Sequence, residues 1–131
     1  MISVIIPTLN AAPHLPRTLE ALAAGTVTGV VKEVIVADGG SGDDTLAIAE
    51  AEGCTIVTTE PGRAKQMRAG VEASKGKWLL SLHADTVLAT GWVEETQRFL
   101  DAPQARKKAA TYTLAFDNVS DEAKRVVFLA R

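Results

Sequence analysis

The sequence lacks the features of a secreted or membrane-spanning protein. Its longest apolar stretches fall well short of the roughly 20 residues that a transmembrane helix needs. Residues 1–7 carry neither the basic start nor the cleavage site of a signal peptide. Cys54 is the only cysteine, so no disulfide can form within the chain. We therefore predict a cytoplasmic protein, either free or peripheral to the membrane.

The sequence also lacks the signatures of several nucleic-acid and nucleotide-binding proteins. The formal net charge is −2, so the basic footprint of a nucleic-acid-binding protein is absent. No G-x-G-x-x-G follows the first apolar run, which argues against a dinucleotide-binding dehydrogenase, and no G-x-x-x-x-G-K-[ST] indicates a P-loop. A sugar nucleotidyltransferase shares the layered architecture and stays an alternative, although no glycine-rich loop with a lysine follows the first predicted strand. An anionic ligand must therefore be held by a few placed groups.

What the sequence does contain is an alternation of apolar, β-branched runs with segments of helical periodicity. Strands are predicted at residues 4–6, 33–37, 55–59 and 78–82, and helices at 13–25, 43–52, 63–74 and 91–100. After Pro103 the pattern weakens, and we expect a strand at 110–116 and a helix at 120–129. With 131 residues and 47% apolar side chains, the chain suffices for one domain with a real core. The alternation predicts a three-layer α/β/α fold with a mostly parallel, Rossmann-like sheet.

Two of the predicted strands end at an aspartate. Residues 34–37 run into Asp38, and residues 78–82 run into His83, Ala84 and Asp85. In an open α/β sheet, ligands bind beyond the carboxyl ends of the strands, so both carboxylates are candidates for a binding site. Each aspartate could also be a simple turn or cap residue. A site is favoured because the same pattern occurs twice.

Three motifs, in this order and at strand ends, resemble those of the family 2 glycosyltransferases. They are residues 3–10 (SVIIPTLN), residues 33–43 (EVIVADGGSGD) and residues 83–85 (HAD). Residues 60–67 (EPGRAKQM), followed by Ala69 and Gly70, are similar to the transferase subgroup associated with radical-SAM and selenium-related domains. That subgroup name describes gene context and not a substrate. The resemblance implies the GT-A fold and a nucleotide-diphosphate sugar donor, with an acceptor that the sequence does not identify.

The resemblance also implies roles for particular residues. The implied substrate-binding residues are Pro7, Thr8, Asn10, Asp38, Gly39, Arg63, Ala84 and Asp85. Asp38 matches the carboxylate that contacts the base or ribose, whereas Arg63 matches a basic residue that approaches the nucleotide. The alternative for Arg63 is an exposed position in the first turn of a helix.

Asp85 matches the last acid of the Asp-x-Asp motif that binds a divalent metal ion, Mg²⁺ or Mn²⁺, bridging the diphosphate. Mg²⁺ is often held by one or two carboxylates plus substrate phosphates, so a single aspartate can suffice. A metal ion would stabilise the charge that develops on the leaving diphosphate. His83 replaces the first acid of the motif, and it could ligate Mn²⁺, orient a water molecule or only pack.

Two departures from the family pattern limit what can be expected. Ala11 stands where many relatives carry a glutamate, and no residue matches the acidic group proposed as general base. We therefore predict a single, truncated nucleotide-sugar-binding domain over residues 1–131, with a core at 1–102 and the start of an acceptor-side region at 103–131. The alternative is a non-catalytic nucleotide-binding or interaction module that pairs with another chain, including a second copy of itself.

Overall fold

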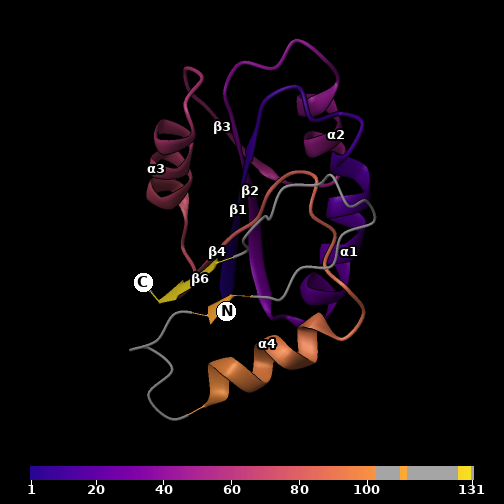
Figure 1. Ribbon diagram of the computed structural model, residues 1–131, viewed down its shortest axis with the longest axis vertical. Coiled ribbons are helices and arrows are strands. Elements are labelled where there is room, and N and C mark those ends of the chain that lie inside the picture. Colours follow the sequence, from indigo (N-terminus) through magenta and orange to yellow (C-terminus); the bar gives the residue numbers. More distant parts are fainter. Residues whose placement is uncertain (103–109, 112–126, 131) are drawn as a thin grey trace, which may run out of the picture.

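The computed structural model describes residues 1–102, 110–111 and 127–130, which form one mixed sheet and four helices (Figure 1). The strands are β1 (Ile2–Thr8), β2 (Val31–Asp38), β3 (Thr55–Thr58), β4 (Trp78–Ser81), β5 (Ala110–Thr111) and β6 (Val127–Ala130). The helices are α1 (Leu15–Thr28), α2 (Thr45–Ala51), α3 (Arg63–Ala73) and α4 (Trp92–Asp101). The strand order is β3-β2-β1-β4-β6-β5. Strands β1 to β4 are parallel, and β6 is antiparallel to both β4 and β5.

The first four strands and helices confirm the predicted α/β fold. The helix predicted at 120–129 is wrong at its end, because residues 127–129 belong to β6 and pair with β4. A short apolar run such as 126–129 (VVFL) does not distinguish a helix from a buried strand, and the partner edge offered by β4 decides between them. The strand predicted at 110–116 is present at Ala110–Thr111. Residues 112–116 and 120–126 lie outside the described residues.

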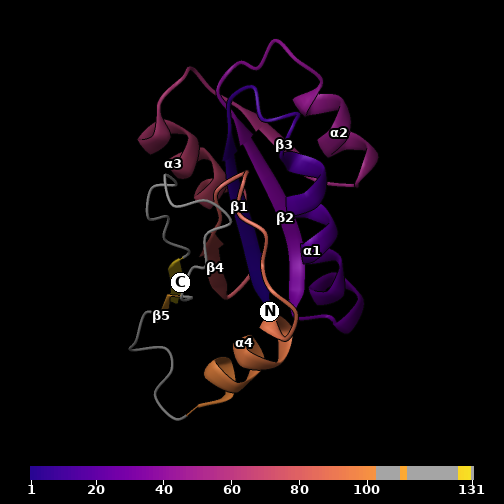
Figure 2. The ribbon, with the colours of Figure 1, turned by 45° about the vertical axis from the view of Figure 1, so that its right-hand side comes forward.

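The helices cover both faces of the sheet. Figures 1 and 2 show α1 and α2 on one face and α3 on the opposite face. The chain steps outward from β1 to β2 to β3 and then returns past β1 to β4. Because parallel crossovers are right-handed, this reversal of direction moves the connecting helix α3 to the other face. The reversal creates a topological switch point between β1 and β4, where open α/β sheets bind their ligands.

The core is aliphatic and is centred on β1. Ile2, Val4, Ile5 and Ile6 are all fully buried, as expected for the central strand of a sheet that is covered on both faces. Helix α1 adds Leu15 and Leu22. Among the described residues, no helix combines the length and the apolar character that a bilayer span requires.

Helix α1 continues beyond Gly25, where the sequence predicts its end. A Cβ added at Gly25 would lie 2.4 Å from Cη2 of Trp92, so this glycine permits the close approach of an aromatic ring and does not cap the helix. The Trp92 indole also donates a hydrogen bond of 2.9 Å to the carbonyl oxygen of Ala21. The helix ends instead at Gly29, whose φ of 86° is the left-handed conformation that glycine adopts readily.

Candidate functional site

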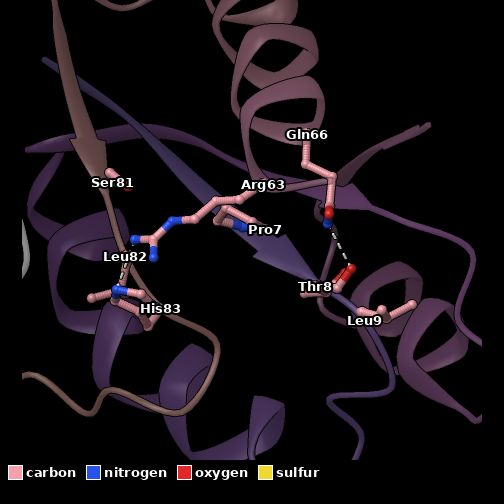
Figure 3. Close-up of a pocket in the computed structure, with 8 residues that line it drawn as sticks. All are labelled: Pro7, Thr8, Leu9, Arg63, Gln66, Ser81, Leu82 and His83. Carbon is pink, nitrogen blue, oxygen red and sulfur yellow. Dashed lines mark hydrogen bonds between the residues drawn. The ribbon is translucent and has the colours of Figure 1, made fainter. Parts of the chain in front are cut away.

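A pocket of about 190 Å³ lies at the carboxyl ends of β1 and β4 (Figure 3). It is lined by Pro7, Thr8, Leu9, Arg63, Gln66, Ser81, Leu82 and His83. Strand β1 extends to Thr8, whereas β4 pairs with it only as far as Ile5 and ends there at Ser81. Beyond the paired residues the segments that follow β1 and β4 separate, and the N-terminal turn of α3 lies beside the gap between them. The pocket therefore occupies the switch point that the topology defines.

Asp38 lies beside this pocket, at the end of β2, and organises the turn that follows. Its side chain is only 1% exposed. Oδ1 accepts hydrogen bonds from the hydroxyls of Thr8 at 2.7 Å and Ser41 at 2.6 Å. Oδ2 accepts from the backbone amides of Gly40 at 3.0 Å and Ser41 at 2.8 Å. Burial by itself raises the pKa of this carboxyl, but the hydrogen bonds from Ser41, Thr8 and Gly40 outweigh that effect and hold the pKa below its ordinary value.

The loop after β1 is joined to the loop after β2 by side-chain hydrogen bonds. The backbone amide of Asn10 donates to Oγ of Ser41 at 2.8 Å, and the amide of Gly42 donates to Oδ1 of Asn10, also at 2.8 Å. The amide of Ala11 donates to Oγ1 of Thr45 at 2.9 Å. Asn10 has a φ of 52°, a left-handed conformation that asparagine tolerates better than most residues. Asn10 therefore shapes the rim of the site through the backbone.

Gln66 is the polar residue that ties the site together. It is 5% exposed, and its Nε2 donates to the carbonyl oxygens of Thr8 at 2.8 Å and Ala37 at 2.9 Å. Its Oε1 accepts from the amide of Gly62 at 3.2 Å. One side chain thus fixes the ends of β1 and β2 to the residue before α3. Because Arg63 follows Gly62, Gln66 also determines where that cation lies.

Arg63 reaches across the pocket toward the turn after β4. Its Nη2 lies 3.0 Å from Nε2 of His83, and Figure 3 shows the guanidinium pointing at the imidazole ring. Arg63 is the first residue of α3, whereas His83 follows β4, so the contact joins the two walls of the pocket. The pocket thus has a cation at its mouth.

The turn that carries Asp85 is anchored from both sides. The hydroxyl of Thr18, in α1, donates to the carbonyl oxygen of Ala84 at 2.6 Å. The amide of Thr86 donates to the carbonyl oxygen of His83 at 3.1 Å. Asp85 itself is exposed. Its carboxylate is therefore presented to solvent on a fixed backbone beside the pocket.

The described residues contain no group of three or more histidine, cysteine or acidic side chains placed to hold a metal ion. An exposed carboxylate and an imidazole two positions apart, Asp85 and His83, are the donors next to the pocket. Mg²⁺ and Mn²⁺ accept few protein ligands when phosphate oxygens and water complete the coordination shell. This donor set fits a metal ion that binds together with a diphosphate, and it does not form a pre-built protein cage.

The structure brings only some of the predicted residues to the pocket surface. Pro7, Thr8, Arg63 and His83 line it, whereas Asn10, Asp38, Gly39, Ala84 and Asp85 do not. Gly39 is buried, and a Cβ there would lie 3.0 Å from Oε1 of Gln66. Sequence reasoning missed Gln66. The feature that could have identified Gln66 is a polar side chain on the buried side of a helix. A search for apolar periodicity does not detect such a residue.

A second pocket, of about 570 Å³, lies between α1 and the loop before α4. It is lined largely by small and aliphatic side chains, among them Ala21, Ala24 and Leu88, and it contains none of the predicted site residues. We assign the site to the smaller pocket because its position at the strand ends and its polar groups fit an anionic ligand, whereas the larger volume alone does not.

Sequence comparisons identify the family of this chain. The model of the family described as Glycosyl transferase family 2 matches residues 3–124. A PGL/p-HBAD biosynthesis glycosyltransferase of Mycobacterium bovis is 39% identical over 95 residues, which cover 67% of this chain and 36% of that protein. A glucosyl-3-phosphoglycerate synthase of Mycobacterium tuberculosis is 30% identical over 95 residues, covering 66% of this chain and 29% of that protein. The chain spans about a third of the length of the curated relatives that it matches.

Solved structures share the fold. The M. tuberculosis glucosyl-3-phosphoglycerate synthase in complex with Mn²⁺, uridine diphosphate and phosphoglyceric acid superposes with a TM-score of 0.60 at 28% identity, covering 66% of this chain and 34% of that chain. S. aureus TarS 1-349 superposes with a TM-score of 0.69 at 25% identity, covering 76% of this chain and 32% of that chain. The matching family model, the relatives and the shared fold place this chain in glycosyl transferase family 2.

Proposed function

We propose that this chain binds a nucleotide-diphosphate sugar in the pocket between β1 and β4 and serves as the donor-binding part of a glycosyltransferase. The observation that carries the proposal is the pocket at the switch point, with Arg63 at its mouth and the Asp85 turn beside it. A cation and a carboxylate that can recruit a metal ion are the groups that a diphosphate requires. The acceptor remains unidentified, and no residue is assigned as the general base.

In this proposal Pro7 and Thr8 form the floor of the nucleotide pocket, and Arg63 contacts the phosphates or the nucleoside. Asn10 and Gly39 shape the surrounding loops. Asp38 has a more indirect role than the family resemblance implies, because its carboxylate accepts hydrogen bonds from Thr8, Gly40 and Ser41 of the chain itself. A direct contact between Asp38 and a nucleoside would require the hydroxyl of Thr8 or Ser41 to turn away from the carboxylate.

We further propose that Asp85 holds Mg²⁺ or Mn²⁺ when the donor is bound, next to the backbone of Ala84. When present, the ion would neutralise charge on the diphosphate leaving group. The M. tuberculosis synthase that shares this fold was crystallised with Mn²⁺ and uridine diphosphate, which makes that pair the first probe to use. Arg63 supplies a second positive charge from the opposite wall, and the fixed backbone of the turn holds the carboxylate in position.

Isothermal titration of the chain with UDP and with GDP, each with Mn²⁺, Mg²⁺ or EDTA, tests the proposal. We expect one of the two nucleotides to bind with an affinity that the metal increases. Asp85→Ala should remove that increase, a loss of about tenfold or more in affinity. Glu50→Ala, which changes an exposed carboxylate on α2, should leave binding unchanged. Absence of binding for both nucleotides, or metal dependence that survives Asp85→Ala, would reject the proposal.

The second candidate is a module that pairs with another chain without catalysis. Strand β3 lies at an edge of the sheet, and its Thr55 and Thr58 are exposed. Unpaired strand edges are common sites of association. Light scattering combined with a turnover assay distinguishes the two functions. A monomer that turns over a sugar donor excludes the module, whereas a stable dimer that binds neither nucleotide supports it.

We also propose that the chain acts in the cytoplasm, free or at the membrane surface. Cys54 is the single cysteine of the sequence, so no disulfide can form within the chain, which agrees with a reducing compartment. Fractionation of cells that produce the chain tests its location. Recovery of the protein outside the cytoplasmic and membrane fractions would contradict this assignment.

A further inference from the structure

The contact between Arg63 and His83 determines which ring nitrogen of the histidine carries the proton. A guanidinium group carries only hydrogen-bond donors, so Nη2 of Arg63 donates and Nε2 of His83 accepts across the 3.0 Å separation. The acceptor nitrogen must be unprotonated, which places the ring proton of the neutral imidazole on Nδ1. The same lone pair on Nε2 cannot bind a metal ion while it accepts this hydrogen bond.

We propose that His83 is a positioning residue, which orients the guanidinium of Arg63 toward the diphosphate or nucleoside of the donor and does not ligate the metal ion through Nε2. This inference rests on the proposed function and deepens it. The proposed role differs from the three that the sequence leaves open for His83, which are metal ligand, water-orienting group and packing residue. Arg63 keeps its other N–H groups for the anion, since a guanidinium has five such donors.

A neutral imidazole suits this task better than a carboxylate. An aspartate at position 83 would form an ion pair with Arg63 and compete with the phosphate for it. Imidazole accepts a hydrogen bond without neutralising the cation, so the Arg63–His83 pair keeps its full positive charge for the ligand. A free arginine side chain loses rotamer entropy when it is ordered. Holding Arg63 in place before binding removes part of that cost.

Both ends of the contact are attached to rigid parts of the fold. The turn of His83 is held by the hydrogen bond from Thr18 to the carbonyl oxygen of Ala84. The first turn of α3 is held by Gln66, which bonds the ends of two strands and the residue before Arg63. The separation between the two side chains is therefore determined by the packing of α1 and α3 on the sheet, and not by a mobile loop.

A double-mutant cycle with UDP affinity as the readout tests the role, in EDTA and in Mn²⁺. His83→Ala should weaken UDP binding about 3- to 10-fold in both conditions, the size expected for coupled neighbours, and should have no effect in an Arg63→Ala background. His83→Gln retains an acceptor oxygen and should restore most of the affinity. His14→Ala, which changes the other histidine at an exposed position, should bind UDP as the wild type does.

Three results would overturn the inference. An effect of His83→Ala that appears only with Mn²⁺, or one that persists in the Arg63→Ala background, would make His83 a metal ligand or an independent contact. No effect of His83→Ala in either condition would show that Arg63 needs no orientation. Wild-type protein that binds neither UDP nor GDP would reject the proposed function together with this role, whereas binding that ignores His83 rejects the role alone.

A second measurement requires no nucleotide. The chain has two histidines, so ring ¹⁵N spectra of histidine-labelled protein can be assigned with His14→Ala. We expect the His83 ring to carry its proton on Nδ1 and to accept at Nε2 at neutral pH or above, and Arg63→Ala to change that tautomer. A His83 ring protonated on Nε2 in the wild type would contradict the hydrogen bond on which the inference depends.

Discussion

Replacing Gln66 with leucine tests whether this side chain holds the site together. The residue is 5% exposed and makes three hydrogen bonds, two as a donor and one as an acceptor. Leucine has a similar volume, so the change removes the polar groups without opening a large cavity. The expected loss therefore measures hydrogen bonding and not packing.

The size of the loss follows from what each partner retains. The carbonyl oxygen of Thr8 also accepts from the amide of Gly39 at 3.0 Å, so it keeps a partner. Gly62 is exposed, and its amide can bond water. The carbonyl oxygens of Thr8 and Ala37 and the amide of Gly62 each lose one hydrogen bond, and a typical hydrogen bond contributes about 0.5–1.5 kcal/mol. We expect Gln66→Leu to lower the free energy of unfolding by about 2 kcal/mol, or the melting temperature by about 5–10 °C.

Urea unfolding of Gln66→Leu and Gln97→Leu provides the measurement. Gln97 is exposed on α4 and donates a hydrogen bond to the exposed Asp101, so its replacement should change stability by less than about 0.5 kcal/mol. Gln66→Leu should also weaken UDP binding, because the hydrogen bond that holds the backbone of Gly62, next to Arg63, is lost. A Gln66→Leu protein as stable as the wild type, or equal losses in the two variants, would refute the reasoning.

Three further predictions concern stability. Asp38→Ala should lower the free energy of unfolding by about 3 kcal/mol, because two hydroxyls and two backbone amides lose their acceptor, and urea unfolding measures the loss. The pKa values of Asp38 and Glu33 are lowered because hydrogen bonds outweigh the raising effect of burial. The stability that these carboxylates contribute is therefore complete above their pKa values in the unfolded chain, which are near 4. This stability is lost as the pH falls through their lower pKa values in the folded protein. Free energies of unfolding that stay constant from pH 7 to pH 2 would contradict this prediction. Gly25→Ala should cost about 1–3 kcal/mol by overpacking against Trp92, whereas Gly42→Ala, which meets nothing within 4 Å, should cost less in the same thermal denaturation.

Much of this protein could be predicted from local patterns. The four parallel strands, the helices between them and the α/β class follow from apolar periodicity, since a covered strand and an amphipathic helix leave different spacings in the sequence. The ends of β2 and β4, at Asp38 and Ser81, differ by one residue each from the predicted ends at 37 and 82. The three motifs also led to the family, which the family model later matched over residues 3–124.

The tertiary structure alone decided how the site residues are used. Asp38 is a buried acceptor for its own chain, Gln66 joins three segments, and Arg63 bonds His83 across the pocket. Each of these contacts joins residues from different elements, and β6 became a strand only because β4 offered an unpaired edge. Periodicity records which face of an element is apolar. Periodicity does not indicate which hydrogen-bond donor meets which acceptor when the two are far apart in the sequence, because those groups come together only when the elements pack.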